Sequence, residues 1–179
     1  MFSKRSLFVP GVLVFTSFLG GRAANAQNPP CYTVSSLQGT WAIIGNYGSN
    51  LAMSLASEHI DGNGNLTRTA VVNEPATTGS TTGARTIVTV LNTGTYTVNC
   101  NGTGTITRIT TSPSGTSTGV DDFVITGAIV KPGNLLAPQA QFIATTIMDA
   151  AQTPSTVVPG GIFLTRVHTR LPDPGPAQQ

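Results

Sequence analysis

Alternating apolar and polar residues, interrupted by clusters of Gly, Asn, Asp and Pro, run through most of this chain and constrain its fold more than any other feature. The segments 53–60 and 66–73 flank one such cluster, Asp-Gly-Asn-Gly-Asn at 61–65. Gly and Asn readily adopt the backbone angles of tight turns, so this arrangement predicts a β-hairpin. Helical periodicity is nearly absent. The sequence therefore predicts an all-β domain.

Nine strand-like segments are expected across this domain, at residues 40–47, 53–60, 66–73, 84–91, 94–100, 105–111, 123–131, 141–149 and 162–171. Polar loops are expected at 75–83 and 112–119. Many short strands with turn-rich connections are typical of a barrel or a sandwich. We predict an antiparallel β-barrel of about eight strands, with a β-sandwich as the alternative.

The N-terminus has the pattern of a cleavable signal peptide. Lys4 and Arg5 precede an apolar stretch at 7–19, which is followed by Ala-Asn-Ala at 24–26. The apolar stretch is shorter than the about 20 residues that a membrane-spanning helix needs. We expect a signal peptide at 1–26, a single β-barrel domain at 27–171 starting with Gln27, and a disordered tail at 172–179. The mature protein would be periplasmic or extracellular, without a membrane span.

The net charge argues against polyanionic partners. The whole chain has a formal charge of +2, but loss of Lys4, Arg5 and Arg22 with the signal peptide would leave six basic and seven acidic side chains. A mature domain of charge −1 lacks the basic surface that binds nucleic acid or anionic membranes. An outer-membrane barrel is also disfavoured, because aromatic residues make up 6% of the chain and the strands are rich in Thr.

The chain has two cysteines, Cys31 and Cys100. In an oxidising compartment, a single pair most simply forms one disulfide. Two free buried thiols are the alternative. A disulfide requires Cα atoms about 4.4–6.8 Å apart, which is the spacing that we expect here.

The cluster at 61–65 also has the beginning of a calcium-binding loop. Asp61, Asn63 and Asn65 alternate as the first ligands of an EF-hand do, but Leu66 and Val72 stand where that loop needs Gly and Glu. A hairpin turn accounts for these residues. We expect no metal and no cofactor.

No catalytic group can be assigned from sequence. A mixed metal site would require convergence of two strand ends, carrying Glu58, His59, Asp61 and His168. Asp121 and Asp122 are adjacent in a strand, so they point to opposite faces and cannot act as a carboxylate pair. No serine is expected on the strand-to-helix turn of a nucleophile elbow, and no Gly-rich loop precedes a helix to hold phosphate, because helical periodicity is nearly absent.

The last predicted strand carries the best candidate site. Arg166, His168 and Arg170 alternate and share one face. If that face looks into a barrel, it could bind an anionic or carbonyl-bearing ligand. If it looks outward, Phe163 and Val167 are buried instead and the cations are solvated, which is the commoner environment of charged side chains. The candidate ligand contacts are Arg166, His168, Arg170 and Tyr96.

Two sequence resemblances support a barrel. Gly-Thr-Trp at 39–41, together with Arg166 and Arg170, resembles the calycin pattern of lipocalins, which implies that a late-strand Arg packs on Trp41 at the barrel floor. Gly-Thr-Trp, the cluster at 61–65, and the run Gly94 to Asn99 followed by Cys100 and Gly-Thr-Gly-Thr at 102–105 resemble small exported bacterial proteins of unknown function. That pattern is similar to allene oxide cyclase and dirigent barrels, although no catalytic residue of those families maps onto this chain.

The expected function is binding of a small apolar or amphipathic ligand inside the barrel. The alternatives are a structural or adhesive β-sandwich without a pocket, and a cofactor-free isomerase or cyclase on an allene oxide cyclase-like barrel. An interior cavity of a few hundred Å³ would favour ligand binding, whereas a fully packed interior would favour a structural role.

Overall fold

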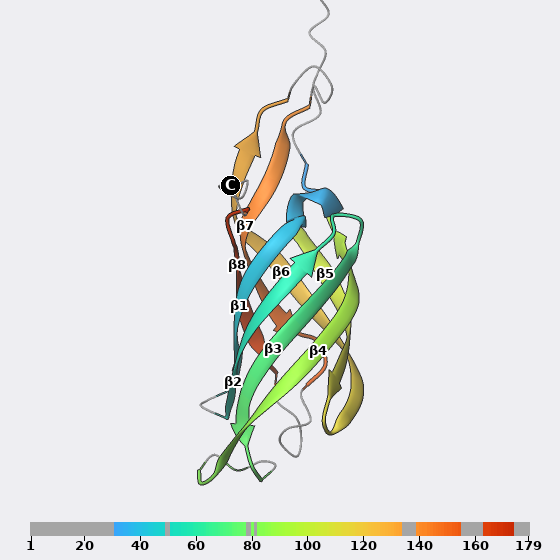
Figure 1. The fold of residues 1–179 in the computed structure, drawn as a ribbon. Coiled ribbons are helices and arrows are strands. Elements are labelled where there is room, and N and C mark those ends of the chain that lie inside the picture. Colours follow the sequence, from blue (N-terminus) through green and yellow to red (C-terminus); the bar gives the residue numbers. More distant parts are fainter. Residues whose placement is uncertain are drawn as a thin grey trace, which may run out of the picture.

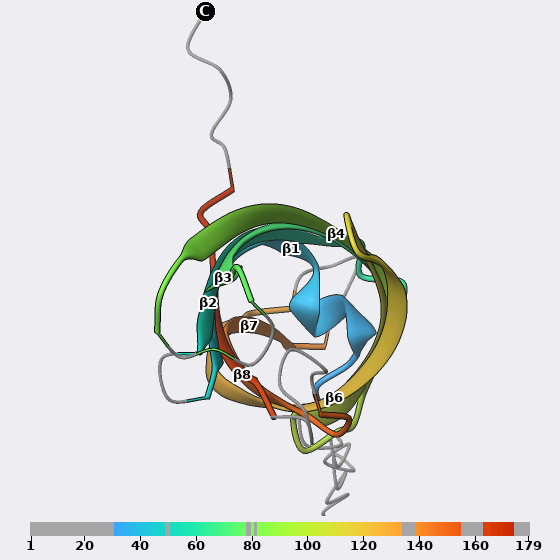
Figure 2. The same ribbon diagram turned by 90° about the horizontal axis from the view of Figure 1, so that it is seen from below.

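A computed structural model describes residues 31–48, 51–77, 80, 82–133, 139–154 and 163–173. Within them, eight antiparallel strands follow one another around a closed barrel (Figures 1 and 2). The closed barrel confirms the predicted fold class and rules out the alternative prediction of a β-sandwich. The predicted signal peptide, Ile162 and residues 174–179 lie outside the described residues.

The barrel is built from neighbours in sequence, and β8 pairs with β1 to close it. A short 3-10 helix, η1, precedes the strands. The elements are η1 Val34–Leu37, β1 Gly39–Tyr47, β2 Ala52–Ile60, β3 Asn65–Pro75, β4 Arg85–Val98, β5 Thr103–Ser112, β6 Gly115–Lys131, β7 Gln141–Ala151 and β8 Thr165–Arg170.

Two predicted boundaries were wrong. The segments 84–91 and 94–100 form the single strand β4, because Asn92 and Thr93 pair with both β3 and β5 and leave no break. The predicted loop at 112–119 is a tight hairpin turn, in which Gly115 has the positive φ of 129° and β6 begins at once. Polar, turn-forming residues at both places continue the ladders because the strands on either side supply hydrogen-bond partners.

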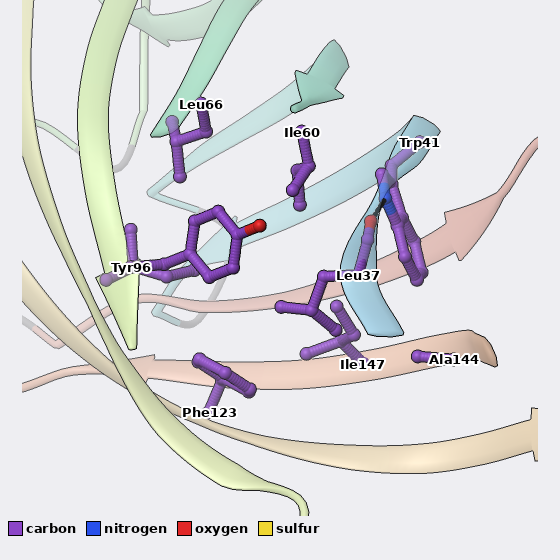
Figure 3. Close-up of a cluster of buried hydrophobic side chains, with 9 residues drawn as sticks. Leu37, Trp41, Ile60, Leu66, Tyr96, Phe123, Ala144 and Ile147 are labelled. Carbon is purple, nitrogen blue, oxygen red and sulfur yellow. Dashed lines mark hydrogen bonds between the residues drawn. The ribbon is translucent and has the colours of Figure 1, made fainter. Parts of the chain in front are cut away.

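One end of the interior is filled by an apolar plug, which we define as η1 and the side chains packed on it (Figure 3). Trp41 Nε1 donates to the Leu37 carbonyl at 2.9 Å, and the Tyr96 hydroxyl donates to the Val34 carbonyl at 2.9 Å. The buried apolar residues of the plug are Leu37, Trp41, Ile60, Leu66, Tyr96, Ile106, Phe123, Ala144 and Ile147. This cluster seals that end of the barrel.

Arg170 fastens the plug to the barrel. Its guanidinium carbon lies 4.8 Å from the centroid of the Trp41 ring, and its Nε donates to the Ala144 carbonyl at 2.6 Å. The terminal nitrogens donate to carbonyls of Ser36, at 3.1 Å, and Gln38. The predicted contact of a late-strand Arg with the first-strand Trp is therefore confirmed.

The disulfide joins Cys31 to Cys100 with a Cα separation of 4.6 Å, which confirms the predicted pairing. The adjacent Tyr32 donates its backbone N–H to the Cys100 carbonyl at 3.3 Å. Its ring also stacks on Phe142 of β7, with centroids 4.7 Å apart. The segment that leads into η1 is thus anchored to two parts of the barrel.

The other end of the interior carries a smaller apolar cluster, formed by Ala52, Ala70, Val72 and Val90 and flanked by Tyr47, Ala56 and Val88. Thr is the commonest residue on the outward faces of the strands, which also carry exposed aliphatic residues such as Ile44, Leu55 and Val167. Among the described residues, no helix is long and apolar enough to cross a bilayer.

Candidate functional site

Seven charged side chains lie in the interior between the two apolar clusters, where they alternate in sign. We call this series the ionic chain: Arg68, Glu58, His168, Asp149, Arg166, Asp121 and Arg108. Strand alternation turns each of these side chains inward, while neighbours such as Thr67 and Val167 face outward. Six strands contribute, so the series extends most of the way around the barrel wall.

The first half of the ionic chain is centred on His168. Arg68 donates through Nε and Nη2 to Glu58 Oε2, at 2.9 and 2.6 Å. His168 Nδ1 lies 3.2 Å from Glu58 Oε1, and its Nε2 lies 2.9 Å from Asp149 Oδ2. One imidazole therefore bridges carboxylates from β2 and β7.

The second half is centred on Asp121. Arg166 donates through Nε to both carboxylate oxygens of Asp149, at 3.0 and 2.9 Å, and its Nη2 forms an ion pair with Asp121 Oδ2 at 2.5 Å. Arg108 donates through Nε and Nη2 to Asp121 at 2.6 and 3.0 Å, and through Nη1 to Thr110 Oγ1 at 3.2 Å. Arg108 ends the ionic chain on β5.

His168 is held in its protonated form. Burial by itself lowers the pKa of His168 and raises the pKa of Glu58 and Asp149. Ion pairs and hydrogen bonds outweigh burial, so the pKa of Glu58 falls to about 2, the pKa of Asp149 is lowered and that of His168 is raised. An ionised carboxylate can only accept hydrogen bonds, so both ring nitrogens of His168 must donate.

The ionic chain consequently carries an excess positive charge. It begins with Arg68 and ends with Arg108, and alternation along it gives four cations against three carboxylates. With His168 protonated, these seven side chains sum to one excess positive charge.

A cavity of about 40 Å³ adjoins the ionic chain. Its polar wall contains the three arginines of the ionic chain, Arg68, Arg108 and Arg166, together with Asn92 of β4. Its apolar wall is formed by Ile43, Ala56, Ala70, Val72 and Val90. Asn92 is buried, and its Nδ2 has no hydrogen-bond partner among the described residues. Arg166 Nη2 likewise has no hydrogen bond of acceptable geometry, despite its ion pair with Asp121.

A larger hollow of about 850 Å³ lies at the plug end, outside the barrel interior. It is bounded by exposed or half-exposed side chains, among them Gln38, His59, Lys131 and Phe142. Because the ionic chain does not reach it, this hollow has no buried charged wall.

The candidate residues of the last strand face the interior. Arg166 is 4% exposed and His168 is fully buried, whereas Phe163 and Val167 are 60% and 40% exposed. The expectation of an outward, solvated cationic face was therefore wrong, because carboxylates on β2, β6 and β7 compensate these cations inside. Of the four candidate ligand contacts, only Arg166 lines the cavity. His168 is buried between Glu58 and Asp149, and Tyr96 and Arg170 hold the plug.

The residues considered for a mixed metal site do not converge. Glu58 and His168 meet, but His59 is exposed on the opposite face of β2. Asp61 accepts hydrogen bonds from the backbones of Asn63 and Asn65, at 2.7 and 3.0 Å, as a turn residue does. No group of three or more His, Cys, Asp and Glu side chains within the described part of the chain is arranged to hold a metal ion.

Sequence reasoning missed most members of the ionic chain, although a signal was present. Arg68 stands in phase with the apolar Leu66 and Ala70, and Asp121 stands in phase with Phe123. A charged residue in phase with the apolar face of a strand must point into the barrel.

Together, the fold and the site define a closed antiparallel β-barrel with an ionic interior and a plug at one end. The chain matches no protein-family model, no curated protein and no solved structure.

Proposed function

We propose that this protein is an exported, calycin-like barrel that binds a small amphipathic ligand in the half of the barrel opposite the plug. The observation that carries the proposal is the lining of the 40 Å³ cavity, which combines a charged wall and an apolar wall. Ligand sites typically combine apolar walls with a few convergent polar groups that orient the ligand.

The size of the cavity restricts the ligand. The cavity of about 40 Å³ does not reach the few hundred Å³ expected for an interior site that encloses a whole ligand, because side chains fill most of the barrel. A head group of a few atoms fits this space. The rest of the ligand must be slender and lie along the small side chains of Ala52, Ala70, Val72 and Val90.

The proposal includes an exported location and a relation to calycin-like barrels. The Cys31–Cys100 disulfide is compatible with an oxidising, exported location, periplasmic or extracellular. The contact of Arg170 with Trp41 supports a place among calycin-like barrels. A small-molecule ligand, without nucleic acid or a membrane span, is the partner that we propose.

The test is native mass spectrometry of the exported protein, which should carry a bound small molecule. Ala70→Leu would narrow the cavity, whereas Ala42→Leu adds the same side chain on the outer face of β1. Ligand occupancy should fall in Ala70→Leu and be unchanged in Ala42→Leu. Equal occupancy in both variants, or a ligand-free wild-type protein that binds no amphiphile in titrations, would contradict the proposal.

A further inference from the structure

We infer that the cavity beside the ionic chain is a monoanion site, which binds a carboxylate or an anion of similar size. The inference deepens the proposed function by naming the head group of its ligand. The assignment of the anion as the head group of an amphipathic ligand rests on the proposed function, whereas the anion site itself does not. The charge and donor arguments below concern the cavity itself.

The charge balance provides the first argument. The four cations and three carboxylates of the ionic chain leave one positive charge in excess. An uncompensated charge away from water is costly. A single negative charge in the cavity would make the cluster neutral, whereas a dianion would leave it negative by one.

The positions of the two ends of the ionic chain provide the second argument. Arg68 and Arg108 are the terminal members of the ionic chain, and both line the same cavity. They belong to β3 and β5, the strands on either side of β4. The ionic chain therefore curves around the interior, and its two cationic ends meet across β4.

Asn92 occupies the gap between these ends. It is the Cα partner of Arg68 on β3 and of Thr110 on β5. Asn92 lines the cavity together with three arginines, and its buried Nδ2 has no hydrogen-bond partner among the described residues. Leaving such a donor unpaired costs about 1–3 kcal/mol, which an acceptor in the cavity would remove.

The dimensions define the chemical class. About 40 Å³ holds a few non-hydrogen atoms, since one water needs roughly 10–15 Å³ on this measure. A carboxylate accepts hydrogen bonds from guanidinium and amide donors in one plane. The anion could be a free small ion or the head group of a longer acid.

Isothermal titration with sodium formate, sodium octanoate, sodium sulfate and 1-octanol separates these cases. We expect formate and octanoate to bind the wild-type protein and sulfate to bind more weakly than formate. Asn92→Leu, which removes the unpaired donor, should weaken both carboxylates by about tenfold. Arg108→Gln, which removes the excess charge, should weaken them at least as much.

Arg85→Gln is the matched control, because Arg85 lies on the same strand as Asn92 but is exposed and bonded to Asn73 and Leu51. It should bind carboxylates as the wild type does. Circular dichroism establishes whether each variant folds. If Arg108→Gln does not fold, Asn92→Leu provides the test.

Tighter binding of octanoate than of formate supports both the anion site and the amphipathic ligand. Equal binding supports the anion site and contradicts the amphipathic ligand. If neither carboxylate binds the wild type, or if Asn92→Leu binds both undiminished, the inference is wrong. Binding of 1-octanol in that case would leave the proposed function standing alone.

Discussion

Glu58 and His168 are 110 positions apart in sequence, and their side chains approach to 3.2 Å inside the barrel. They come from β2 and β8, the two strands that flank β1. This contact therefore spans the seam at which the barrel closes. The same imidazole reaches Asp149 on β7, so a single side chain ties three strands to one charge network.

The adjacent residues Asp121 and Asp122 offer a matched pair for measuring the contribution of the ionic chain. Asp121 is fully buried between Arg108 and Arg166, while Asp122 is exposed and accepts a hydrogen bond from Gln152. Asp121→Asn should lower the free energy of unfolding by about 3–5 kcal/mol, because it leaves the buried Arg166 and the half-buried Arg108 poorly compensated. Asp122→Asn should cost less than about 1 kcal/mol. Urea unfolding measures both losses. Losses of similar size would show that the ionic chain contributes no more to stability than an exposed hydrogen bond does.

Stability should pass through a maximum in mildly acidic solution. Glu58 has a pKa lowered to about 2, so its stabilising effect is present above its unfolded value of 4.5 and is lost as the pH falls toward 2. His168 has a raised pKa, so its contribution is complete below 6.5 and is lost as the pH rises through its folded value. Urea midpoints should therefore be highest between about pH 4.5 and 6.5.

His168→Gln tests the basic limb of this profile. The groups that face His168 are Glu58 and Asp149, which are paired in turn with Arg68 and Arg166. The variant should be less stable than the wild type at pH 6 and should lose the decline above that pH. If the stability of His168→Gln declines above pH 6 as steeply as that of the wild type, a group other than His168 causes the decline.

Removing Arg170 should loosen the plug. Arg170→Ala deletes donors to the carbonyls of Ser36, Gln38 and Ala144 and the cation on Trp41, at a cost of roughly 2–3 kcal/mol. Trp41 fluorescence should shift to longer wavelength as water reaches the ring. Lys131→Ala, which removes an exposed cation, is the control and should change neither quantity.

Loss of the disulfide should destabilise the barrel without rearranging it. The bond closes a loop with a sequence separation of 69, which corresponds to about 4 kcal/mol in the chain-entropy treatment. Replacing Cys31 and Cys100 by Ser should lower the free energy of unfolding by about 2–4 kcal/mol. The wild type in reducing agent should match this variant. A stable reduced protein would instead assign the anchoring of this segment to the stacking of Tyr32 on Phe142.

Local patterns predicted the barrel but not its interior. The turn at 61–65 and the alternation around it determine which residues of β2 and β3 pair, and these signals lie within a few positions of each other. The ionic chain joins residues from six strands, and charged side chains are solvated so often that an inward Arg166 was not the favoured expectation. Its carboxylate partners become apparent only once β6, β7 and β8 are placed side by side.

The strand order has a consequence for how the chain reaches this state. Seven of the eight strand pairings join consecutive strands, and only the pairing of β1 with β8 joins distant ones. Each hairpin can form with a small loss of chain entropy, whereas the last pairing must bring Trp41 and Arg170 together across nearly the whole domain. Until β8 is in place, one edge of β1 remains unpaired. A chain that ends before β8 would keep two open edges, and with them a template for association with other unpaired strands.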